Sequence, residues 1–256
     1  MRIVIKIGTS TLTHPNASMN VRRIENLCKI ISEIKKAGNE VIMVSSGAIA
    51  MGISKLNLSE KPQDIAGKQA CAAVGQCELM YIYDKLFLEY NHTVAQILLT
   101  APDLKIEDRN KNFTNTIEKL LSLKALPIIN ENDTVEVEEI KVGDNDTLAA
   151  LVANSINANL LILLSDIDGL YTKDPHKSND AELIHEVFEI DNSIISLGGG
   201  AGSKLGTGGM QTKLKAATIV TENGCDMIIM NGNNPENLYS IIDNKPCGTR
   251  FYSRKK

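Results

Sequence analysis

The sequence predicts an α/β fold, a three-layer αβα sandwich around a mainly parallel sheet. Short apolar runs of strand length alternate along the chain with longer segments of helical period. Several runs are apolar at consecutive positions, as in Leu160–Leu164, which is typical of a strand covered on both faces. Such alternation implies right-handed crossovers between parallel strands, with a layer of helices on each side of the sheet.

The expected elements follow from these two patterns. Six apolar runs are expected to form strands: Arg2–Ile7, Glu40–Ser45, Thr93–Leu99, Ala125–Asn130, Leu160–Ser165 and Asp226–Met230. Five segments have a helical period: Val21–Lys36, Lys68–Tyr90, Asn110–Leu123, Thr147–Asn157 and Met210–Asn223. No linker, low-complexity block or repeat interrupts the sequence, so a single domain is expected over residues 1–256, with two lobes that meet near residue 158.

The composition is that of an ordinary globular enzyme, with 43% hydrophobic and 23% charged residues. The net charge of −4 and the scattered lysines and arginines argue against a broad nucleic-acid surface. The five cysteines are irregularly spaced and include no CxxC pair, which argues against a disulfide framework and against a zinc site. No apolar stretch approaches the roughly 20 residues of a membrane helix, and Lys6 interrupts the first apolar run. A cytoplasmic protein without a signal peptide is expected.

The first predicted strand contains a lysine and leads into Gly8-Thr9-Ser10. In open parallel sheets, ligands gather beyond the carboxyl ends of strands, so a motif that follows a strand is a candidate site. Lys6 lies on the face opposite Ile3, Ile5 and Ile7. It is either a cation that faces phosphate or an edge-strand lysine that reaches solvent.

The second strand leads into Ser45-Ser46-Gly47-Ala48. Small residues that open a helix present free N–H groups, which suit a carboxylate or a phosphate. Serine is equally a favoured helix cap. Both interpretations of Ser46 stay open on the sequence alone.

The segment Lys141–Asp146 is the most informative part of the chain. It follows Asn130–Asp133 and directly precedes a predicted helix. Asp144, Asn145 and Asp146 offer two carboxylates and an amide, more than one helix cap needs. Their oxygens can accept hydrogen bonds from a substrate ammonium group or orient nearby lysines, and a solvated acidic turn is the alternative. The segment predicts an ammonium-binding site.

Two later segments suit a nucleotide. Ser165 and Asp166 follow the fifth strand, in a turn that lacks the glycine position and the closing glutamate of a calcium loop. The glycine-rich stretch 198–209 runs into a helix without the spacing of a Walker A loop, and its backbone N–H groups can surround phosphates. Lys213 stands in the first turn of that helix, where a cation is unfavourable unless an anion is bound. The four histidines fall outside these segments, and no role is assigned to them.

Together these motifs resemble the amino acid kinase family, and within it the glutamate 5-kinase branch. The similar segments occur in order along essentially the whole chain: Lys6–Ser10, Ser46–Ala50, Lys68–Ala70, Ala73–Gln76, Asn130–Asp133, Lys141–Asp146, Asp168–Thr172 and Gly206–Lys213. The combination of Ile140–Asp146 with Gly206–Met210 is specific to this branch. Acetylglutamate kinases and aspartokinases typically carry a Gly-Gly pair after the first-strand lysine, where this chain has Gly8-Thr9.

The resemblance implies an enzyme that transfers the γ-phosphate of ATP to the γ-carboxylate of L-glutamate, the first step of proline biosynthesis. It implies a glutamate-binding lobe at about residues 1–157 and a nucleotide-binding lobe at about residues 158–256. The implied glutamate contacts are Ser46, Asp133, Asn145 and Asp146. The implied ATP contacts are Lys6, Ser165, Asp166, Thr207, Gly208, Gly209, Met210, Gln211, Thr212 and Lys213.

The implied catalytic groups are the cations of Lys6 and Lys213, held by ion pairing to Asp144 or Asp146. Asp146 is favoured for the substrate, and the role of Asp144 stays open. Mg²⁺ is expected to travel on the ATP phosphates, so no protein ligands are assigned to it.

The resemblance also implies a homo-dimer or homo-tetramer, feedback inhibition by proline and contact with glutamyl phosphate reductase. Many bacterial members carry a C-terminal PUA domain, and this sequence is expected to lack one. The alternatives are a related kinase that acts on acetylglutamate, aspartate or a nucleoside monophosphate, and a non-catalytic regulator with the same fold. Neither a nucleic acid nor a membrane is expected as a partner.

Overall fold

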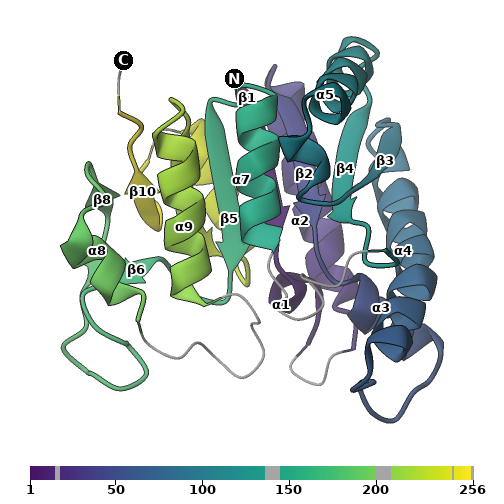
Figure 1. Cartoon of the computed structure of the whole chain (residues 1–256), viewed down its shortest axis with the longest axis horizontal. Helices are drawn as coiled ribbons and strands as arrows, with labels where there is room; N and C mark the ends of the chain where they lie inside the picture. The colour runs from purple at the N-terminus through teal and green to yellow at the C-terminus, as the bar shows by residue number, and fades with distance from the viewer. Residues whose placement is uncertain (15–17, 136–144, 200–208, 244, 255–256) are drawn as a thin grey trace.

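The computed structural model describes residues 1–14, 18–135, 145–199, 209–243 and 245–254. It confirms the predicted three-layer α/β architecture, with one eight-stranded sheet between two layers of helices (Figure 1). The strands of this sheet, in spatial order, are β3 (Val94–Leu99), β4 (Leu126–Glu131), β2 (Glu40–Ser45), β1 (Arg2–Ile7), β5 (Leu160–Ser165), β9 (Asp226–Asn231), β10 (Thr249–Phe251) and β8 (Glu186–Val187). A separate two-stranded sheet pairs β6 (Leu170–Tyr171) with β7 (Leu183–Ile184).

The six long strands are parallel, and the short β10 is antiparallel to β9. The chain passes from β1 to β2 on one side and later places β5 on the other side of β1. The strand order therefore reverses next to β1, at the position where open α/β sheets form a ligand-binding crevice. In this register Ile7 lies opposite Ser45 of β2 and Leu164 of β5, so the carboxyl ends of the three central strands are level.

The helices cover both faces of the sheet, and each face has its own apolar core (Figure 1). The described helices are α1 (Thr9–Leu12), α2 (Val21–Lys36), α3 (Ala48–Lys55), α4 (Ile65–Leu88), α5 (Glu107–Ser122), α7 (Asn145–Ser155), α8 (Asn192–Leu197), α9 (Met210–Thr221) and α10 (Tyr239–Ile242), with 3₁₀ turns η1 (Asp103–Lys105) and η2 (Pro235–Leu238). One core contains side chains of α2 and α4, and the other contains side chains of α5, α7 and α9.

Strand β1 supplies both cores by simple alternation. Ile3, Ile5 and Ile7 point into the core with α2 and α4, and Val4 points into the core with α7 and α9. Lys6 shares the face of Val4. Because β1 is a central strand, Lys6 is only 8% exposed, and the interpretation of an edge-strand lysine that reaches solvent is wrong.

The predicted strands and helices are present, with shifts of a few residues at some ends. Helix α4 begins earlier than its apolar period, because Asp64 accepts a hydrogen bond from the backbone N–H of Gly67 and caps it. Helix α7 begins at Asn145 rather than Thr147, which brings Asn145 and Asp146 into its first turn. This shift determines where their side chains point.

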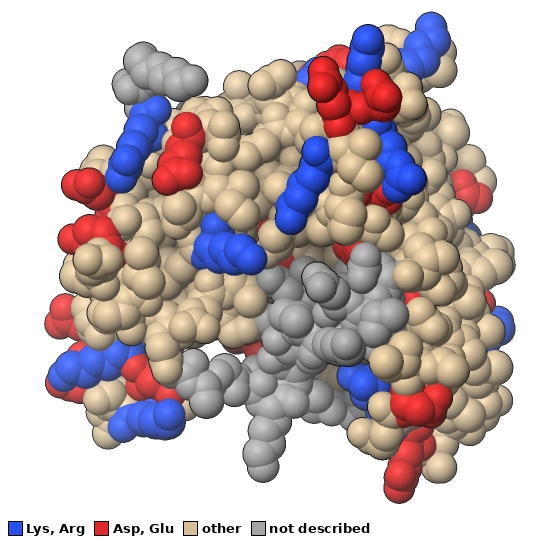
Figure 2. Space-filling model, in the orientation of Figure 1, with Lys and Arg blue, Asp and Glu red and all other residues tan. Residues whose placement is uncertain are grey.

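The surface agrees with the charge pattern of the sequence. On the face shown in Figure 2, basic and acidic side chains are interspersed and form no single basic patch. Within the part of the chain that the structure describes, no helix is both long and apolar enough to cross a bilayer.

Candidate active site

A buried group of three charged side chains lies on the α7–α9 side of the sheet. The Nζ atom of Lys6 lies 2.6 Å from Oδ1 of Asp146, and the Nζ atom of Lys213 lies 2.9 Å from Oδ2 of the same carboxylate. The three residues come from β1, α7 and α9, far apart in the sequence. Asp146 is fully buried, and both lysines are at least nine-tenths buried. We call this group the lysine cluster.

The lysine cluster places two ammonium groups around one carboxylate inside the protein. Burial alone would raise the pKa of the Asp146 carboxyl group, but the two ammonium groups in contact with it outweigh burial and hold its pKa far below the ordinary value. Asp146 is therefore ionised at neutral pH and pairs with both lysines. Two ammonium groups held this close together are suited to an anionic ligand.

The start of α9 holds Lys213 in place. The extended backbone of Gly209 opens the helix, and the Thr212 hydroxyl lies 2.8 Å from the Gly209 carbonyl oxygen. The same Oγ1 atom lies 3.1 Å from Oδ2 of Asp146. The first turn of α9 thus joins the lysine cluster directly, and backbone N–H groups at the N-terminus of α9 lie beside it.

Asn145 lies one residue before Asp146, and its amide nitrogen has three acceptors. Its Nδ2 atom lies 3.0 Å from the Ser45 carbonyl oxygen, 2.9 Å from Ser46 Oγ and 3.0 Å from Asn130 Oδ1. These acceptors determine the orientation of the amide. Its Oδ1 atom is buried and has no hydrogen-bond partner among the described residues. A buried acceptor without a donor is costly, so this oxygen is suited to a ligand that donates a hydrogen bond.

A turn after β4 carries Asp133. The backbone N–H of Asn132 donates to the Leu99 carbonyl oxygen at 2.7 Å, and Gln69 of α4 donates from its side chain to the Thr134 carbonyl oxygen at 3.3 Å. These two bonds hold the turn against β3 and α4. Burial raises the pKa of the Asp133 carboxyl group to about 6, so a cationic ligand would stabilise its charged form.

A second set of polar groups follows β5 and β9. Ser165 is buried at the end of β5, and its hydroxyl donates to Asp166 at 3.2 Å. The backbone N–H of Gly232, after β9, donates to the Ser165 carbonyl oxygen at 2.7 Å. Asp168 accepts from Asn231 at 2.7 Å and from the Tyr171 hydroxyl at 3.0 Å. These bonds give the β5–β9 edge a defined shape on the side of β1 away from Asp133.

Comparisons with known proteins show the family and the fold of this chain. The amino acid kinase family matches residues 1–231 of the chain. The chain belongs to the amino acid kinase family. Its fold resembles carbamate kinase from Giardia lamblia bound to AMP-PNP, with a TM-score of 0.67, 19% identity and coverage of 99% of this chain and 98% of that chain. It also resembles isopentenyl phosphate kinase of T. acidophilum in a product complex, with a TM-score of 0.62, 16% identity and coverage of 98% of this chain and 100% of that chain.

Within the family, the curated relatives confirm the predicted branch. A protein named glutamate 5-kinase from Clostridium perfringens is 52% identical, over 99% of this chain and 96% of the relative. The glutamate 5-kinase of Enterococcus faecalis is 46% identical, over 98% and 94%. In Caldanaerobacter subterraneus the protein of that name is 50% identical over 100% of this chain, which covers 68% of the longer relative.

Several predicted site residues of this amino acid kinase come together in the structure. The lysine cluster contains Lys6, Asp146 and Lys213, and Ser46 reaches it through Asn145. Both oxygens of Asp146 contact lysines, so Asp146 itself is a carboxylate that holds the two cations. Its additional contact with the substrate stays a prediction.

Other predicted positions either fall outside the described residues or are not part of the lysine cluster. Asp144, Thr207 and Gly208 fall outside the described residues. Met210 packs against the α5–α7–α9 core, and Gln211 is exposed at the start of α9.

Sequence reasoning missed the contribution of two amides. Asn130 and Gln76 stand in segments that carry the family resemblance, yet no role follows from their positions in the sequence. In the structure Asn130 Nδ2 donates to Gln76 Oε1 at 2.8 Å, and both side chains are at least nine-tenths buried. The available signals were the place of Asn130 at the end of a predicted strand and the place of Gln76 next to Gly75.

As an ATP-dependent kinase the protein uses Mg²⁺ with ATP, and the absence of dedicated protein ligands for the ion stays a prediction. Among the described residues, no three histidine, cysteine or carboxylate side chains are arranged to hold a metal ion. The buried carboxylate of the site, Asp146, is directed at lysines on both oxygens. A metal bound to the nucleotide phosphates would need few protein ligands, and Asp166 and Asp168, both exposed after β5, are carboxylates beside that edge.

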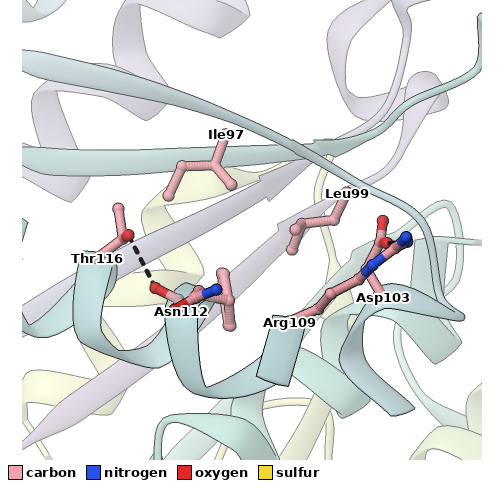
Figure 3. A pocket seen from close by; sticks show the side chains of 7 residues that line it. Ile97, Leu99, Asp103, Arg109, Asn112 and Thr116 are labelled. Atoms are coloured by element: carbon pink, nitrogen blue, oxygen red, sulfur yellow. Dashed lines mark hydrogen bonds and ion pairs between the residues drawn. The ribbon is translucent and has the colours of Figure 1, made fainter. Parts of the chain in front are cut away.

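A cavity of about 320 Å³ lies away from the lysine cluster, between β3 and α5 at the edge of the sheet (Figure 3). Ile97, Leu99 and Phe113 form its apolar wall, and an ion pair between Asp103 and Arg109 lies at its rim. Strands β4 and β2 separate β3 from β1. The cavity therefore contributes nothing to the candidate active site.

Proposed function

We propose that this protein transfers the γ-phosphoryl group of ATP to the γ-carboxylate of L-glutamate, giving γ-glutamyl phosphate and ADP. The observation that carries the proposal is the lysine cluster, in which one buried carboxylate holds two buried ammonium groups at the centre of the sheet. The identity to relatives named glutamate 5-kinase supports glutamate as the acceptor.

The reaction needs neutralisation of charge rather than a general base. The γ-carboxylate of glutamate is already ionised at neutral pH. One of its oxygens forms a bond to the γ-phosphorus as the bond between that phosphorus and the β–γ bridging oxygen breaks, and the bridging oxygen leaves with ADP. The obstacle is repulsion, because two like charges about 4 Å apart interact by about 4 kcal/mol at an effective dielectric constant near 20.

The two lysines of the cluster are suited to reduce this repulsion. Lys6 comes from the first half of the chain and Lys213 from the second, so one carboxylate holds together a cation from each. A buried cation whose position is set before the reaction stabilises transferring phosphoryl oxygens without reorganisation. Mg²⁺ on the phosphates would supply further positive charge when it is bound.

The glutamate end of the site is proposed to lie at the carboxyl ends of β2 and β4. Asn145 Oδ1 and the carboxylate of Asp133 are acceptors for the α-ammonium group. Ser46 Oγ accepts from Asn145, so its own hydrogen can be donated to a substrate carboxylate. These contacts support the proposal that glutamate binds in the lobe of about residues 1–157.

The nucleotide end is proposed to lie at β5, β9 and the start of α9, in the lobe of about residues 158–256. Ser165, Asp166 and Thr212 contribute polar side chains at that edge. Helix α9 begins after Gly209, and the first backbone N–H groups of a helix have no partner four residues earlier within it.

Proline carries a carboxylate and an ammonium group, so feedback inhibition is proposed to act by competition at the acceptors for glutamate. A homo-oligomer, contact with glutamyl phosphate reductase and a cytoplasmic location stay predictions.

The test is acceptor specificity. ADP release is measured with L-glutamate, N-acetylglutamate, L-aspartate and a nucleoside monophosphate, and acyl phosphate is trapped with hydroxylamine. Hydroxamate formation with L-glutamate alone is expected. Preference for another acceptor would show that the protein is a different member of the family. ATP binding without acceptor-dependent ADP release would support the non-catalytic alternative.

A further inference from the structure

Three side-chain amides form a continuous chain of hydrogen bonds that runs from the candidate active site into α4. Asn145 Nδ2 lies 3.0 Å from Asn130 Oδ1, and Asn130 Nδ2 lies 2.8 Å from Gln76 Oε1. Asn145 and Asn130 are almost completely buried, and Gln76 is 9% exposed. Gln76 is the end of this amide chain, and it contacts neither the lysine cluster nor Ser46 in any bond found among the described residues.

The backbone determines the direction of the amide chain. The backbone N–H of Glu131 donates to Asn130 Oδ1 at 2.9 Å, so that atom must be the oxygen. The Nδ2 atom of Asn130 is then directed at Gln76, which has to present an acceptor. At the other end, the Ser45 carbonyl oxygen requires Asn145 to present its nitrogen there. The unpartnered Oδ1 atom of Asn145 is left to face a ligand.

Two glycines bring Gln76 to this position. A Cβ atom on Gly75 would lie 1.8 Å from the Ala48 carbonyl oxygen, and a Cβ atom on Gly52 would lie 1.8 Å from the Cys71 carbonyl oxygen. Helices α3 and α4 are therefore in backbone contact at these positions, where side chains would keep them apart. Because α3 begins at Ala48, just after Ser46 and Gly47, this helix contact fixes the position of Gln76 relative to Ser46 at the glutamate end of the site.

We propose that Gln76 is a positioning residue for glutamate binding. Its Oε1 atom accepts from Asn130 Nδ2, and together with the backbone N–H of Glu131 it holds the Asn130 side chain in place. Asn130 Oδ1 is one of the three acceptors that orient Asn145, whose own Oδ1 faces the substrate ammonium group. Without the Gln76 acceptor, the buried Asn130 Nδ2 loses its partner and this support of Asn145 is weakened. The inference rests on the proposed function. It concerns affinity for glutamate, since Gln76 does not contact the lysine cluster.

The deciding variant is Gln76→Met, which has similar length and no acceptor oxygen. We expect the KM for glutamate to rise about tenfold, equivalent to about 1.4 kcal/mol. The kcat and the KM for ATP should stay within about twofold of wild type, because Gln76 does not contact the lysine cluster. Gln76→Glu keeps the acceptor, so its KM for glutamate should return to within about threefold of wild type, a difference below 1 kcal/mol.

Tyr83→Phe is the matched control in the same helix. The buried Tyr83 hydroxyl bonds to Ser45 Oγ at 2.9 Å, whereas Asn145 uses the Ser45 carbonyl oxygen. The control removes a buried hydrogen bond from α4 and leaves every partner of Asn145 in place. It should lower the melting temperature without raising the KM for glutamate.

Each outcome decides the inference. An unchanged KM in Gln76→Met, an equal rise in Tyr83→Phe, or an equal fall of kcat would overturn it. If Gln76→Met does not fold, Gln76→Glu decides: a KM near wild type supports the role of the acceptor, and a tenfold rise overturns it. Wild-type protein without glutamate-dependent ADP release would overturn the proposed function and this inference together. Active wild type with an indifferent Gln76 would overturn this inference alone.

Discussion

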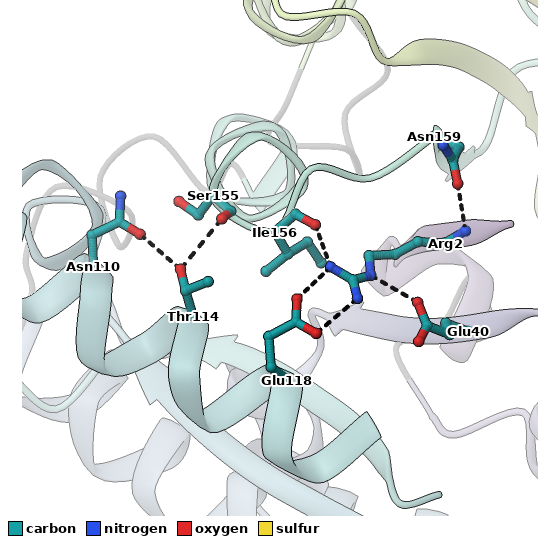
Figure 4. Close-up of polar contacts among 8 residues, drawn as sticks. All are labelled: Arg2, Glu40, Asn110, Thr114, Glu118, Ser155, Ile156 and Asn159. Atoms are coloured by element: carbon teal, nitrogen blue, oxygen red, sulfur yellow. Dashed lines mark hydrogen bonds and ion pairs between the residues drawn. The ribbon is translucent and has the colours of Figure 1, made fainter. Parts of the chain in front are cut away.

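The two ends of β1 each carry a cluster of charged side chains, and the two clusters differ in sign and in exposure. At the amino end, Arg2 donates to Glu40 at 2.9 Å and to both oxygens of Glu118 at 2.6 and 3.0 Å (Figure 4). One cation meets two carboxylates, and both carboxylates are about half exposed. At the carboxyl end, one carboxylate meets two cations, and all three groups are buried.

The difference separates a structural ion pair from a candidate catalytic one. Water solvates the surplus negative charge around Arg2, so that cluster is complete without a ligand. It joins β1 to β2 and α5, and Arg2 also donates to the Ile156 carbonyl oxygen at 2.6 Å (Figure 4). Lys6 and Lys213 lie where little water reaches them. Burial of two ammonium groups has a cost in stability, which is explained if they bind an anion such as ATP.

The largest expected effect is on turnover at the carboxyl end. Lys6→Met or Lys213→Met should lower kcat by about 10²–10³-fold, because each removes a preorganised cation from the transferring phosphoryl group. Circular dichroism should show a folded protein. Turnover near wild type in either variant would contradict the role of the lysine cluster, and Arg2→Met serves as the matched control on the same strand.

The next effect is on stability. Asp146→Asn should lower the free energy of unfolding by about 3–5 kcal/mol at neutral pH, because it leaves two buried lysines without their carboxylate. The folded pKa of Asp146 lies below the ordinary value of 3.8, so this stabilisation is present above about pH 4 and is lost as the pH falls further. Urea unfolding in phosphate-free buffer measures it. A variant as stable as wild type at pH 7 would refute the prediction.

A smaller effect concerns glutamate affinity and pH. The pKa of Asp133 is raised to about 6 by burial, so the carboxylate becomes protonated as the pH falls through 6. The KM for glutamate should then rise several-fold between pH 7.5 and pH 5.5, and Asp133→Asn should show a high KM without this pH dependence. Because the folded pKa lies above the ordinary value, ionised Asp133 lowers stability, and Asp133→Asn should melt higher at pH 7. A KM that keeps its pH dependence in the variant would argue against Asp133.

The smallest effect is at the amino end of β1. Arg2→Met should lower the free energy of unfolding by about 1–2 kcal/mol, since it removes hydrogen bonds to half-exposed carboxylates and one buried bond to a carbonyl group. The kcat and both KM values should not change. A loss of turnover comparable to that of Lys6→Met would abolish the contrast between the two ends of the strand.

Much of the fold could be predicted because its signals are local. Strands β1, β2 and β5 have the predicted bounds, since continuous apolar runs end at Gly, Ser or Asp residues. The short strands β6, β7, β8 and β10 could not be predicted, because two or three residues carry no period. The start of α7 was placed two residues late, since Asn145 bonds to Ser45, Ser46 and Asn130, which are distant in the sequence.

The sequence by itself determined that the candidate site residues follow strands, because polarity, glycine content and hydrophobic period are properties of neighbouring residues. It left open whether Asp144 or Asp146 holds the lysines, and it gave no role to Gln76. The tertiary structure showed that Asp146 pairs with both lysines and that Gln76 bonds to Asn130. Ion pairing and amide orientation depend on atoms a few ångströms apart in space, and Lys6, Asp146 and Lys213 are brought within that distance only by the packing of β1, α7 and α9.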